Sequence, residues 1–196
     1  MIILYGGSFN PPTMAHFKII EILDKLYTPS CIVLMPVGNN YNKPELLDGD
    51  LRLAMTKLMT AKFSNAETSD YEVKRPFEGT IRSLEYLEKT YQDKVALAIG
   101  ADNLLYLETW IEAKKLIKNY KIIVFNRDNL ITEEFIKDFE TKYEIILDII
   151  NFDFDISASL IRSNIKKYRK YLLPEVYKFI KKNKLYLKEG KRWKKC

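Results

Sequence analysis

The sequence predicts an α/β protein built on a doubly wound, mostly parallel β-sheet, with a helical segment at the C-terminus. Short apolar runs alternate along the chain with stretches whose apolar residues recur at helical spacing. Several runs contain no polar residue, which is typical of strands that a parallel sheet buries on both faces. Because a helical stretch separates most successive runs, the chain order implies βαβ crossovers.

The elements of the first half follow from this pattern. They are a strand at residues 2–5 ended by Gly6 and Gly7, a helix with Phe17, Ile20, Leu23 and Tyr27 on one face, a strand at residues 30–38 closed by proline and glycine, a helix at residues 51–59, a strand at residues 71–75, and a helix that begins at Thr80. A polar loop that contains Lys43 precedes the second helix.

The second half continues the alternation. Its elements are a strand at residues 95–100, a helical stretch that holds Trp110, a strand at residues 121–125, a helix at residues 132–142, a strand at residues 144–150, a helix that opens at residues 156–162, and a final helix at residues 174–183. In such sheets ligands bind beyond the carboxyl ends of the strands, where the chain order reverses. Gly7, Gly38 and Gly100 would all lie there.

Length and charge give the domain organisation. The chain has 196 residues, of which 47% are hydrophobic, and this suffices for one core. We therefore expect a single domain at residues 1–187 and a basic tail at residues 188–196. The net charge of +6 is uneven, because residues 162–196 hold 14 Lys and Arg against 2 acidic residues. Such an end favours polyanions, although a solvated surface is the preferred interpretation of the tail itself.

Apolar segments and cysteines narrow the class of protein further. No apolar stretch approaches the roughly 20 residues of a membrane span, and the N-terminus lacks the features of a signal peptide. We therefore expect a soluble, cytoplasmic protein without a membrane partner. Cys31 lies in an expected strand and Cys196 is the last residue, so their spacing indicates neither a structural disulfide nor a metal site.

The stretch from residue 6 to residue 16 has the arrangement of an anion site. A strand, a glycine turn and a helix N-terminus meet there, so free N–H groups and the positive end of the helix dipole converge. The loop carries Ser8 and Asn10, while Thr13 and the only histidine, His16, share the first helical turn. The spacing fits neither G-x-G-x-x-G nor G-x-x-x-x-G-K-[ST]. On these residues alone, His16 is either a phosphate ligand or a half-buried structural histidine.

A second candidate anion site opens the helix at residues 156–162. Ser157 is placed to cap this helix, which would by itself explain the serine. Ser159 and Arg162 are three positions apart, so both can face one anion. Beyond the final helix, Lys184-Leu185-Tyr186 is interpreted as a docking segment.

These segments together resemble one known family. The stretch G-G-S-F-N-P-P-T-x-x-H at residues 6–16 is similar to the first motif of the (H/T)-x-x-H nucleotidyltransferase superfamily, and in detail to its nicotinate mononucleotide adenylyltransferase branch. The resemblance covers nearly the whole chain. Further matching segments are I-G-A-D-N at residues 99–103 with Trp110 after it, I-S-A-S-L-I-R at residues 156–162, the end from Leu173 to Tyr186, Arg52 to Met55, and Lys43.

The resemblance implies a Rossmann-like nucleotidyltransferase fold and a reaction in NAD biosynthesis. ATP and nicotinate mononucleotide would give deamido-NAD and pyrophosphate, with Mg²⁺ assisting. By resemblance, the catalytic residues are His16, Thr13 and Arg162. The implied ATP-binding residues are Gly7, Ser8, Phe9, Thr13, His16, Gly100, Asp102, Ile156, Ser157, Ser159 and Arg162, and the implied mononucleotide-binding residues are Asn39, Lys43, Thr80, Trp110 and Arg127. Because the substrate's phosphate is the nucleophile, alignment and charge neutralisation are what such a site must supply.

The chain also departs from the family pattern. Residues 79–84 read G-T-I-R-S-L where the family usually has Y-T-x-D-T-L, so Arg82 replaces an acid. The preference between nicotinate and nicotinamide mononucleotide is therefore open. Ala158 and Ser159 replace Ser-Thr, which keeps a hydroxyl at position 159. Trp110 either stacks on the pyridine ring or belongs to the core.

Two alternative functions were weighed. A sister transferase would use phosphopantetheine or a cytidine nucleotide, but the segment from Gly100 to Trp110 and the Lys43 loop argue against it. A non-catalytic nucleotide- or RNA-binding module would use the basic end. Thr13, His16 and Arg162 argue against loss of catalysis, and the basic segment lacks the aromatic interleaving of a single-strand platform. We therefore expect no nucleic acid partner, and we leave open whether the chain forms a homo-oligomer and whether protein side chains ligate the metal.

Overall fold

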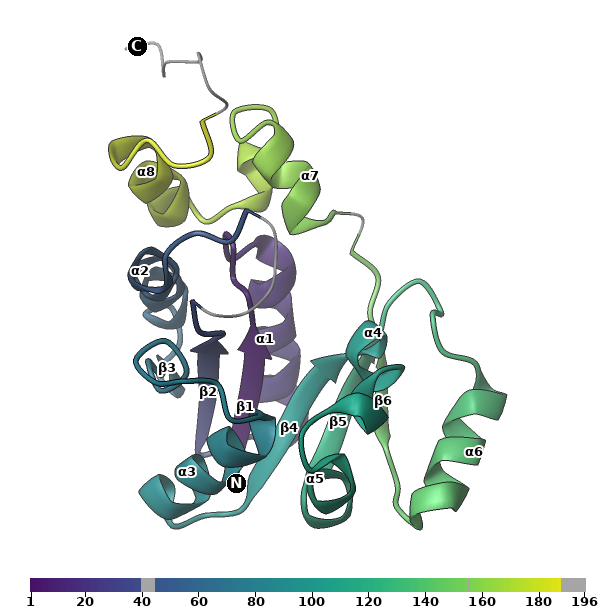
Figure 1. Ribbon diagram of the computed structural model, residues 1–196. Coiled ribbons are helices and arrows are strands. Elements are labelled where there is room, and N and C mark those ends of the chain that lie inside the picture. The colour runs from purple at the N-terminus through teal and green to yellow at the C-terminus, as the bar shows by residue number, and fades with distance from the viewer. Residues whose placement is uncertain (40–44, 155, 188–196) are drawn as a thin grey trace.

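The computed structural model describes residues 1–39, 45–154 and 156–187. Six parallel strands form one sheet, and helices cover both of its faces (Figure 1), which confirms the predicted fold class. The strands are β1 (Ile2–Gly7), β2 (Cys31–Pro36), β3 (Ala66–Thr68), β4 (Val95–Gly100), β5 (Lys121–Asn126) and β6 (Asp148–Asn151).

The strand order contains one reversal. It runs β3-β2-β1-β4-β5-β6, so the chain first builds outward from β1 on one side and then returns to add β4 on the other. Ile2 pairs with Cys31 of β2 and with Val95 of β4. Because the adjacent crossovers leave β1 and β4 in opposite directions, a crevice opens beyond their carboxyl ends.

The helices divide between the two faces of the sheet. They are α1 (Met14–Tyr27), α2 (Gly49–Thr60), α3 (Thr80–Tyr91), α4 (Ala101–Leu104), η1 (Leu107–Thr109), α5 (Ala113–Asn119), α6 (Glu133–Tyr143), α7 (Ala158–Ser163), η2 (Arg169–Tyr171) and α8 (Pro174–Lys182). Side chains of α3, α5 and α6 pack with Ile2 and Leu4 of β1, whereas α1, α2, α7 and α8 pack with Ile3 and Tyr5. Successive residues of a strand point to opposite faces, which produces these two cores.

The C-terminal helices have a place of their own. Figure 1 shows α7 and α8 beyond the arrowheads of β1 and β2, which is the edge where ligands of such sheets bind. In the described parts of the chain, none of the helices has the length and apolar composition needed to cross a membrane.

Three sequence predictions were wrong in detail. The third strand is β3 at residues 66–68, and residues 71–75 form turns, with the amide of Lys74 bonded to the carbonyl of Asp70. An edge strand of three residues is too short to show an apolar run. Trp110 lies in extended backbone between η1 and α5, so no helix holds it. The sixth strand begins only at residue 148, where pairing with Ile123 of β5 starts, and residues 144–147 connect it to α6.

Candidate active site

A cavity of about 440 Å³ lies at the point where the strand order reverses. Leu4 and Gly6 of β1 line it together with Leu97 and Ile99 of β4. Its size is within the range of small-molecule sites. Five residues predicted to bind substrates line this cavity, and they are Gly7, Ser8, Thr80, Asp102 and Trp110.

Two glycines let the walls of the cavity approach each other. Gly79 precedes α3 with a φ of 96°, and a Cβ there would lie 2.8 Å from the Cβ of Ile111. Gly100 ends β4, and a Cβ there would lie 2.4 Å from Oδ1 of Asp102. A larger residue at either position would therefore displace a wall of the cavity.

The imidazole of His16 is held in one tautomer by Thr13. The backbone N–H of Thr13 donates to Nδ1 of His16 at 2.9 Å, and Oγ1 of Thr13 lies 2.8 Å from the same nitrogen. Because a backbone N–H can only donate, Nδ1 is an acceptor and the neutral ring carries its proton on Nε2. Thr13 is itself buried, with 2% of its surface exposed. Its hydroxyl thus orients the imidazole.

Aromatic rings surround His16. The ring of Phe9 lies 5.1 Å from the imidazole, centre to centre, and that of Tyr5 lies at 6.2 Å. Burial lowers the pKa of His16 from 6.5 to about 4, although the hydrogen bond with Thr13 acts in the opposite direction. His16 is therefore a neutral N–H donor near pH 7. Phe9 as a whole is 1% exposed and belongs to the core.

Arg162 reaches the same loop from the other end of the chain. Its Nη1 donates to the backbone carbonyl of Asn10 at 2.9 Å, across 152 residues of sequence. Its Nε lies 3.7 Å from a carboxylate oxygen of Glu45 and makes no hydrogen bond, although it is buried. The structure thus brings the predicted arginine to the loop that precedes Thr13 and His16, with an unused donor.

Ser157 caps the helix that carries Ser159 and Arg162, as the sequence predicts. Oγ of Ser157 accepts from the backbone N–H of Leu160 at 3.2 Å and lies 2.9 Å from Oγ of Ser159. Arg127, predicted to bind the mononucleotide, lies beside this motif, since its Nη1 is 3.5 Å from the carbonyl of Ile156. Ser157, Ser159, Arg162 and Arg127 do not line the cavity described above.

Asn39 holds the start of α2. Its Oδ1 accepts from the backbone N–H of Gly49 at 2.6 Å and from Nη2 of Arg52 at 3.3 Å, and its Nδ2 donates to Asp48 at 3.1 Å. These three contacts fix the orientation of the amide. Lys43, the other predicted residue of this loop, lies outside the described residues.

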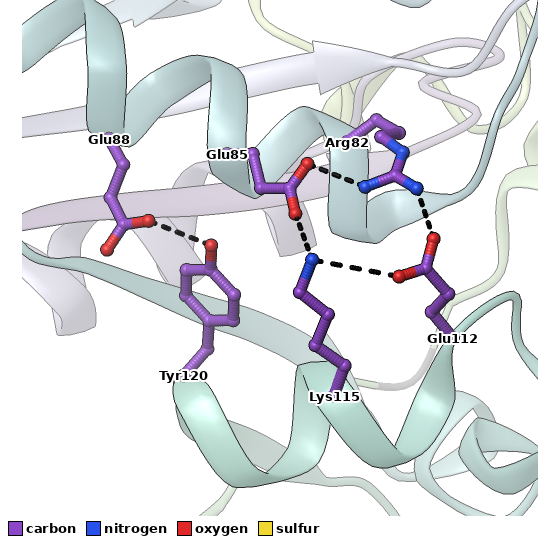
Figure 2. Close-up of polar contacts among 6 residues, drawn as sticks. All are labelled: Arg82, Glu85, Glu88, Glu112, Lys115 and Tyr120. Atoms are coloured by element: carbon purple, nitrogen blue, oxygen red, sulfur yellow. Dashed lines mark hydrogen bonds and ion pairs between the residues drawn. The ribbon is translucent and has the colours of Figure 1, made fainter.

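Arg82, the residue that departs from the family pattern, belongs to an ion-pair network. Figure 2 shows its guanidinium between Glu85 and Glu112, with Lys115 completing the group. The Arg82–Glu85 and Lys115–Glu85 bonds are 2.8 and 2.6 Å long, and Lys115 lies 3.7 Å from Glu112. The network ties α3 to the start of α5, on the two sides of the cavity. From α3 and its cap, Thr80 and Gly79 line the cavity, and Arg82 does not.

Sequence reasoning gave no role to two buried charged residues near this site, Glu72 and Arg52, although it placed Arg52 in a segment that matches the family. Glu72 lines the cavity with 7% of its surface exposed and accepts a hydrogen bond from Ser83 at 2.7 Å. Burial raises the pKa of Glu72, and the bond from Ser83 opposes this. Arg52 is fully buried and donates from Nε to the carbonyl of Leu47 at 2.7 Å. Its place within the apolar stretch from Leu51 to Met55 was the available signal.

Within residues 1–39, 45–154 and 156–187, no group of three or more His, Cys, Asp or Glu side chains is arranged to hold a metal ion. The described part of the chain therefore supplies no metal cage of its own.

Comparisons with known proteins agree with this arrangement. The family model described as "Cytidylyltransferase-like" matches residues 4–164. A probable nicotinate-nucleotide adenylyltransferase of Acholeplasma laidlawii is 38% identical over 95% of this chain and 97% of its own length. One from Helicobacter pylori is 36% identical over 83% of this chain and 91% of its own length.

A solved structure shares the fold. The nicotinic acid mononucleotide adenylyltransferase of Plasmodium falciparum, complexed with NaAD, has a TM-score of 0.76 at 20% identity, with 94% of this chain and 96% of that chain covered. At that identity the likeness supports the fold alone. The matching residues and the two relatives confirm the resemblance found in the motifs. The chain belongs to the cytidylyltransferase-like family and, within it, to the nicotinate-nucleotide adenylyltransferases.

Proposed function

We propose that this chain transfers the adenylyl group of ATP to nicotinate mononucleotide, as the names of its relatives state for those proteins. A phosphate oxygen of the mononucleotide attacks the α-phosphorus of ATP. The bond from the α-phosphorus to the bridging oxygen of the β-phosphate breaks, and its electron pair leaves with pyrophosphate. The product is the dinucleotide deamido-NAD, an intermediate of NAD biosynthesis.

One observation carries the proposal: two predicted phosphate-binding elements from opposite ends of the chain meet beside a cavity of mononucleotide size. Arg162 is bonded to Asn10, three residues before Thr13. Gly7 at the end of β1 and Ser8 at the start of the same loop line the cavity. A ligand in the cavity and a polyphosphate near Arg162 would therefore share the loop between them.

On the ATP side, we assign His16 and Arg162 to the phosphates. The Nε2–H of His16 is a donor with a fixed orientation, and the Nε of Arg162 is a buried donor without a hydrogen bond. Such preorganised donors stabilise charge that develops on the phosphates during transfer. Ser157 and Ser159 are assigned to the leaving phosphates, and Gly100 and Asp102 to the nucleoside.

On the acceptor side, we assign the cavity to the pyridine mononucleotide. Trp110 and Thr80 line it, and the indole offers a face for an aromatic ring. Asn39, Lys43 and Arg127 are proposed for the mononucleotide phosphate. The Nδ2 group of Asn39 donates one hydrogen to Asp48, which leaves its second hydrogen for a phosphate oxygen.

The reaction needs no activated side-chain nucleophile, because the acceptor phosphate attacks directly. The chain has to align the two substrates and neutralise charge, which is the main source of catalysis in phosphoryl transfer. We propose that Mg²⁺ arrives as part of the ATP complex, with phosphate oxygens and waters as its ligands. There it neutralises charge on the phosphates. Because the reaction consumes ATP, the cytoplasm is the compartment we propose.

The test is an assay of pyrophosphate release by the purified chain with ATP and Mg²⁺. Nicotinate mononucleotide, nicotinamide mononucleotide and phosphopantetheine are supplied in separate reactions, and CTP replaces ATP in a further one. We expect release with ATP and nicotinate mononucleotide, with the dinucleotide as co-product. Release only with phosphopantetheine or only with CTP would identify a sister transferase, and the absence of release in every reaction would refute the proposal.

A further inference from the structure

Asn10 joins segments that are far apart in the sequence. It is 3% exposed and follows β1 in the loop that leads to Thr13 and His16. Its Nδ2 donates to the carbonyl of Glu45 at 2.9 Å, and its Oδ1 accepts from the hydroxyl of Tyr186 at 2.7 Å. All of its side-chain bonding thus goes to two segments, one before α2 and one after α8.

The orientation of this amide follows from its partners. A backbone carbonyl can only accept, so the NH₂ group of Asn10 must face Glu45 and its oxygen must face Tyr186. Tyr186 must then donate. Burial raises the pKa of Tyr186, although the positive charges of Arg162 and Arg52 act in the opposite direction. The hydroxyl therefore keeps the proton that this bond requires.

The backbone after α8 is shaped to bring Tyr186 to this place. Lys184 has a φ of 54°, and the N–H of Leu185 bonds to the carbonyl of Ile180 at 3.0 Å, which is a common way to end a helix. Tyr186 has a φ of 58°, which the helix end does not require. A side chain in this region carries a steric cost, so its contacts must hold it there. Leu185 is buried and anchors the segment from the other side.

The same loop residue supports the proposed phosphate ligand. The carbonyl of Asn10 accepts from Nη1 of Arg162 at 2.9 Å, and Nε of Arg162 faces the carboxylate of Glu45 at 3.7 Å. The two residues that locate this guanidinium are therefore Asn10 itself and Glu45, and the side-chain amide of Asn10 bonds to the backbone of Glu45. Tyr186 holds that amide from its other side.

We propose that Tyr186 is a positioning residue for adenylyl transfer, which acts through Asn10 to hold Arg162 at the ATP phosphates. The proposal rests on the function proposed above. It also gives the segment Lys184-Leu185-Tyr186, which the sequence singled out as a docking segment, a role at the site. Loss of the hydroxyl leaves a buried acceptor on Asn10 unpaired, and the amide is then free to reorient.

The experiment compares the full-length chain with Tyr186→Phe, which removes the hydroxyl only. We expect kcat/KM for ATP to fall on the order of 10-fold in protein that is fully folded at the assay temperature, because a buried hydrogen-bonding group loses its partner. Tyr168→Phe is the matched control, since it removes a hydroxyl from the same C-terminal region without touching Asn10. This control substitution should leave kcat and KM for ATP unchanged.

A double-mutant cycle shows whether Tyr186 acts through Asn10. Asn10→Ala should also lower kcat/KM for ATP, and adding Tyr186→Phe to it should cause no further loss. Losses that multiply would overturn the proposal. So would a Tyr186→Phe protein that melts at a lower temperature but keeps its kcat/KM, because that is the result of a structural role alone. If Tyr186→Phe does not fold, Asn10→Asp breaks the same connection between Glu45 and Tyr186, because it keeps the acceptor for Tyr186 and loses the donor to Glu45.

The experiment distinguishes failure of this inference from failure of the proposed function. The affinity of the same variants for ATP, measured by calorimetry, does not depend on which acceptor the enzyme uses. If the unmodified chain binds ATP but releases no pyrophosphate, the proposed reaction fails, and the inference is then judged by the affinity alone. An unchanged affinity together with an unchanged kcat/KM in Tyr186→Phe overturns the inference while leaving the reaction intact.

Discussion

The environment of His16 predicts how the stability of this protein depends on pH. Its pKa is about 4 in the folded chain and 6.5 in the unfolded chain, so between these values the unfolded state binds the additional proton. Stability is therefore full above pH 6.5 and falls as the pH decreases toward 4. One pKa unit corresponds to about 1.4 kcal/mol, so the loss is at most about 3.5 kcal/mol.

The measurement is unusually clean because His16 is the only histidine. Urea unfolding at several pH values between 4 and 7 gives the free energy of unfolding of the natural chain and of His16→Gln. Glutamine does not titrate, and at the third position of a helix it can accept a hydrogen bond from the capping residue. It therefore keeps the contact with the N–H of Thr13. Above pH 6.5, we expect the free energy of unfolding of both proteins to depend on pH in the same way. Below pH 6.5, the free energy of unfolding of the natural chain should fall more than that of His16→Gln.

A direct titration decides the matter independently. The carbon-bound protons of the single imidazole can be followed by NMR, and their shift should move with a midpoint near 4. A midpoint close to 6.5, together with parallel stability curves for the two proteins, would refute the reasoning. The imidazole would then be solvated, and the aromatic rings of Tyr5 and Phe9 would not exclude water from it.

Further predictions concern the two substrate sites. His16→Ala should lower kcat on the order of 10²–10³-fold with little change in melting temperature, because one preorganised donor is lost; an unchanged kcat would exclude this role. Arg162→Ala should raise the Kd for ATP, and calorimetry that finds the natural affinity would count against the assignment. Trp110→Ala should raise KM for the mononucleotide and leave KM for ATP unchanged. Gly79→Ala should lower the melting temperature, since a Cβ meets Ile111, and an unaltered melting curve would contradict that contact.

The sequence predicted the inner, buried strands well and misplaced the bounds of the two edge strands, β3 and β6. The runs at residues 95–100 and 121–125 match β4 and β5, which lie inside the sheet and need apolar residues on both faces. The edge strand β3 pairs with β2 alone, and only its three residues Ala66, Glu67 and Thr68 take part. Pairing with a neighbour, rather than composition, makes such a segment a strand.

The candidate site likewise has features that the local sequence predicts and contacts that only the fold creates. Thr13 and His16 could be placed together because one helical turn connects them, and the glycine turn before them is a local signal. The bond from Tyr186 to Asn10 spans 176 residues, and no periodicity encodes it. The burial of Arg52 likewise depends on acceptors from Ser8, Asn39 and Leu47, which the fold assembles around the guanidinium.

The two cores of the fold suggest why the loop after β1 is central to the proposed reaction. Helix α1, which carries His16, packs on the face of Ile3 and Tyr5, as does the helix of Arg162. The cavity walls at Thr80 and Trp110 belong to segments that pack on the opposite face, with Ile2 and Leu4. Donor and acceptor nucleotides would thus be held by opposite sides of one sheet. Only an element beyond the carboxyl ends of the strands can touch both. Gly7 and Ser8 lie there, at the point where the strand order reverses. The proposed transfer therefore has to take place over this loop, which makes the fixed position of Asn10 a condition for bringing the two phosphates together.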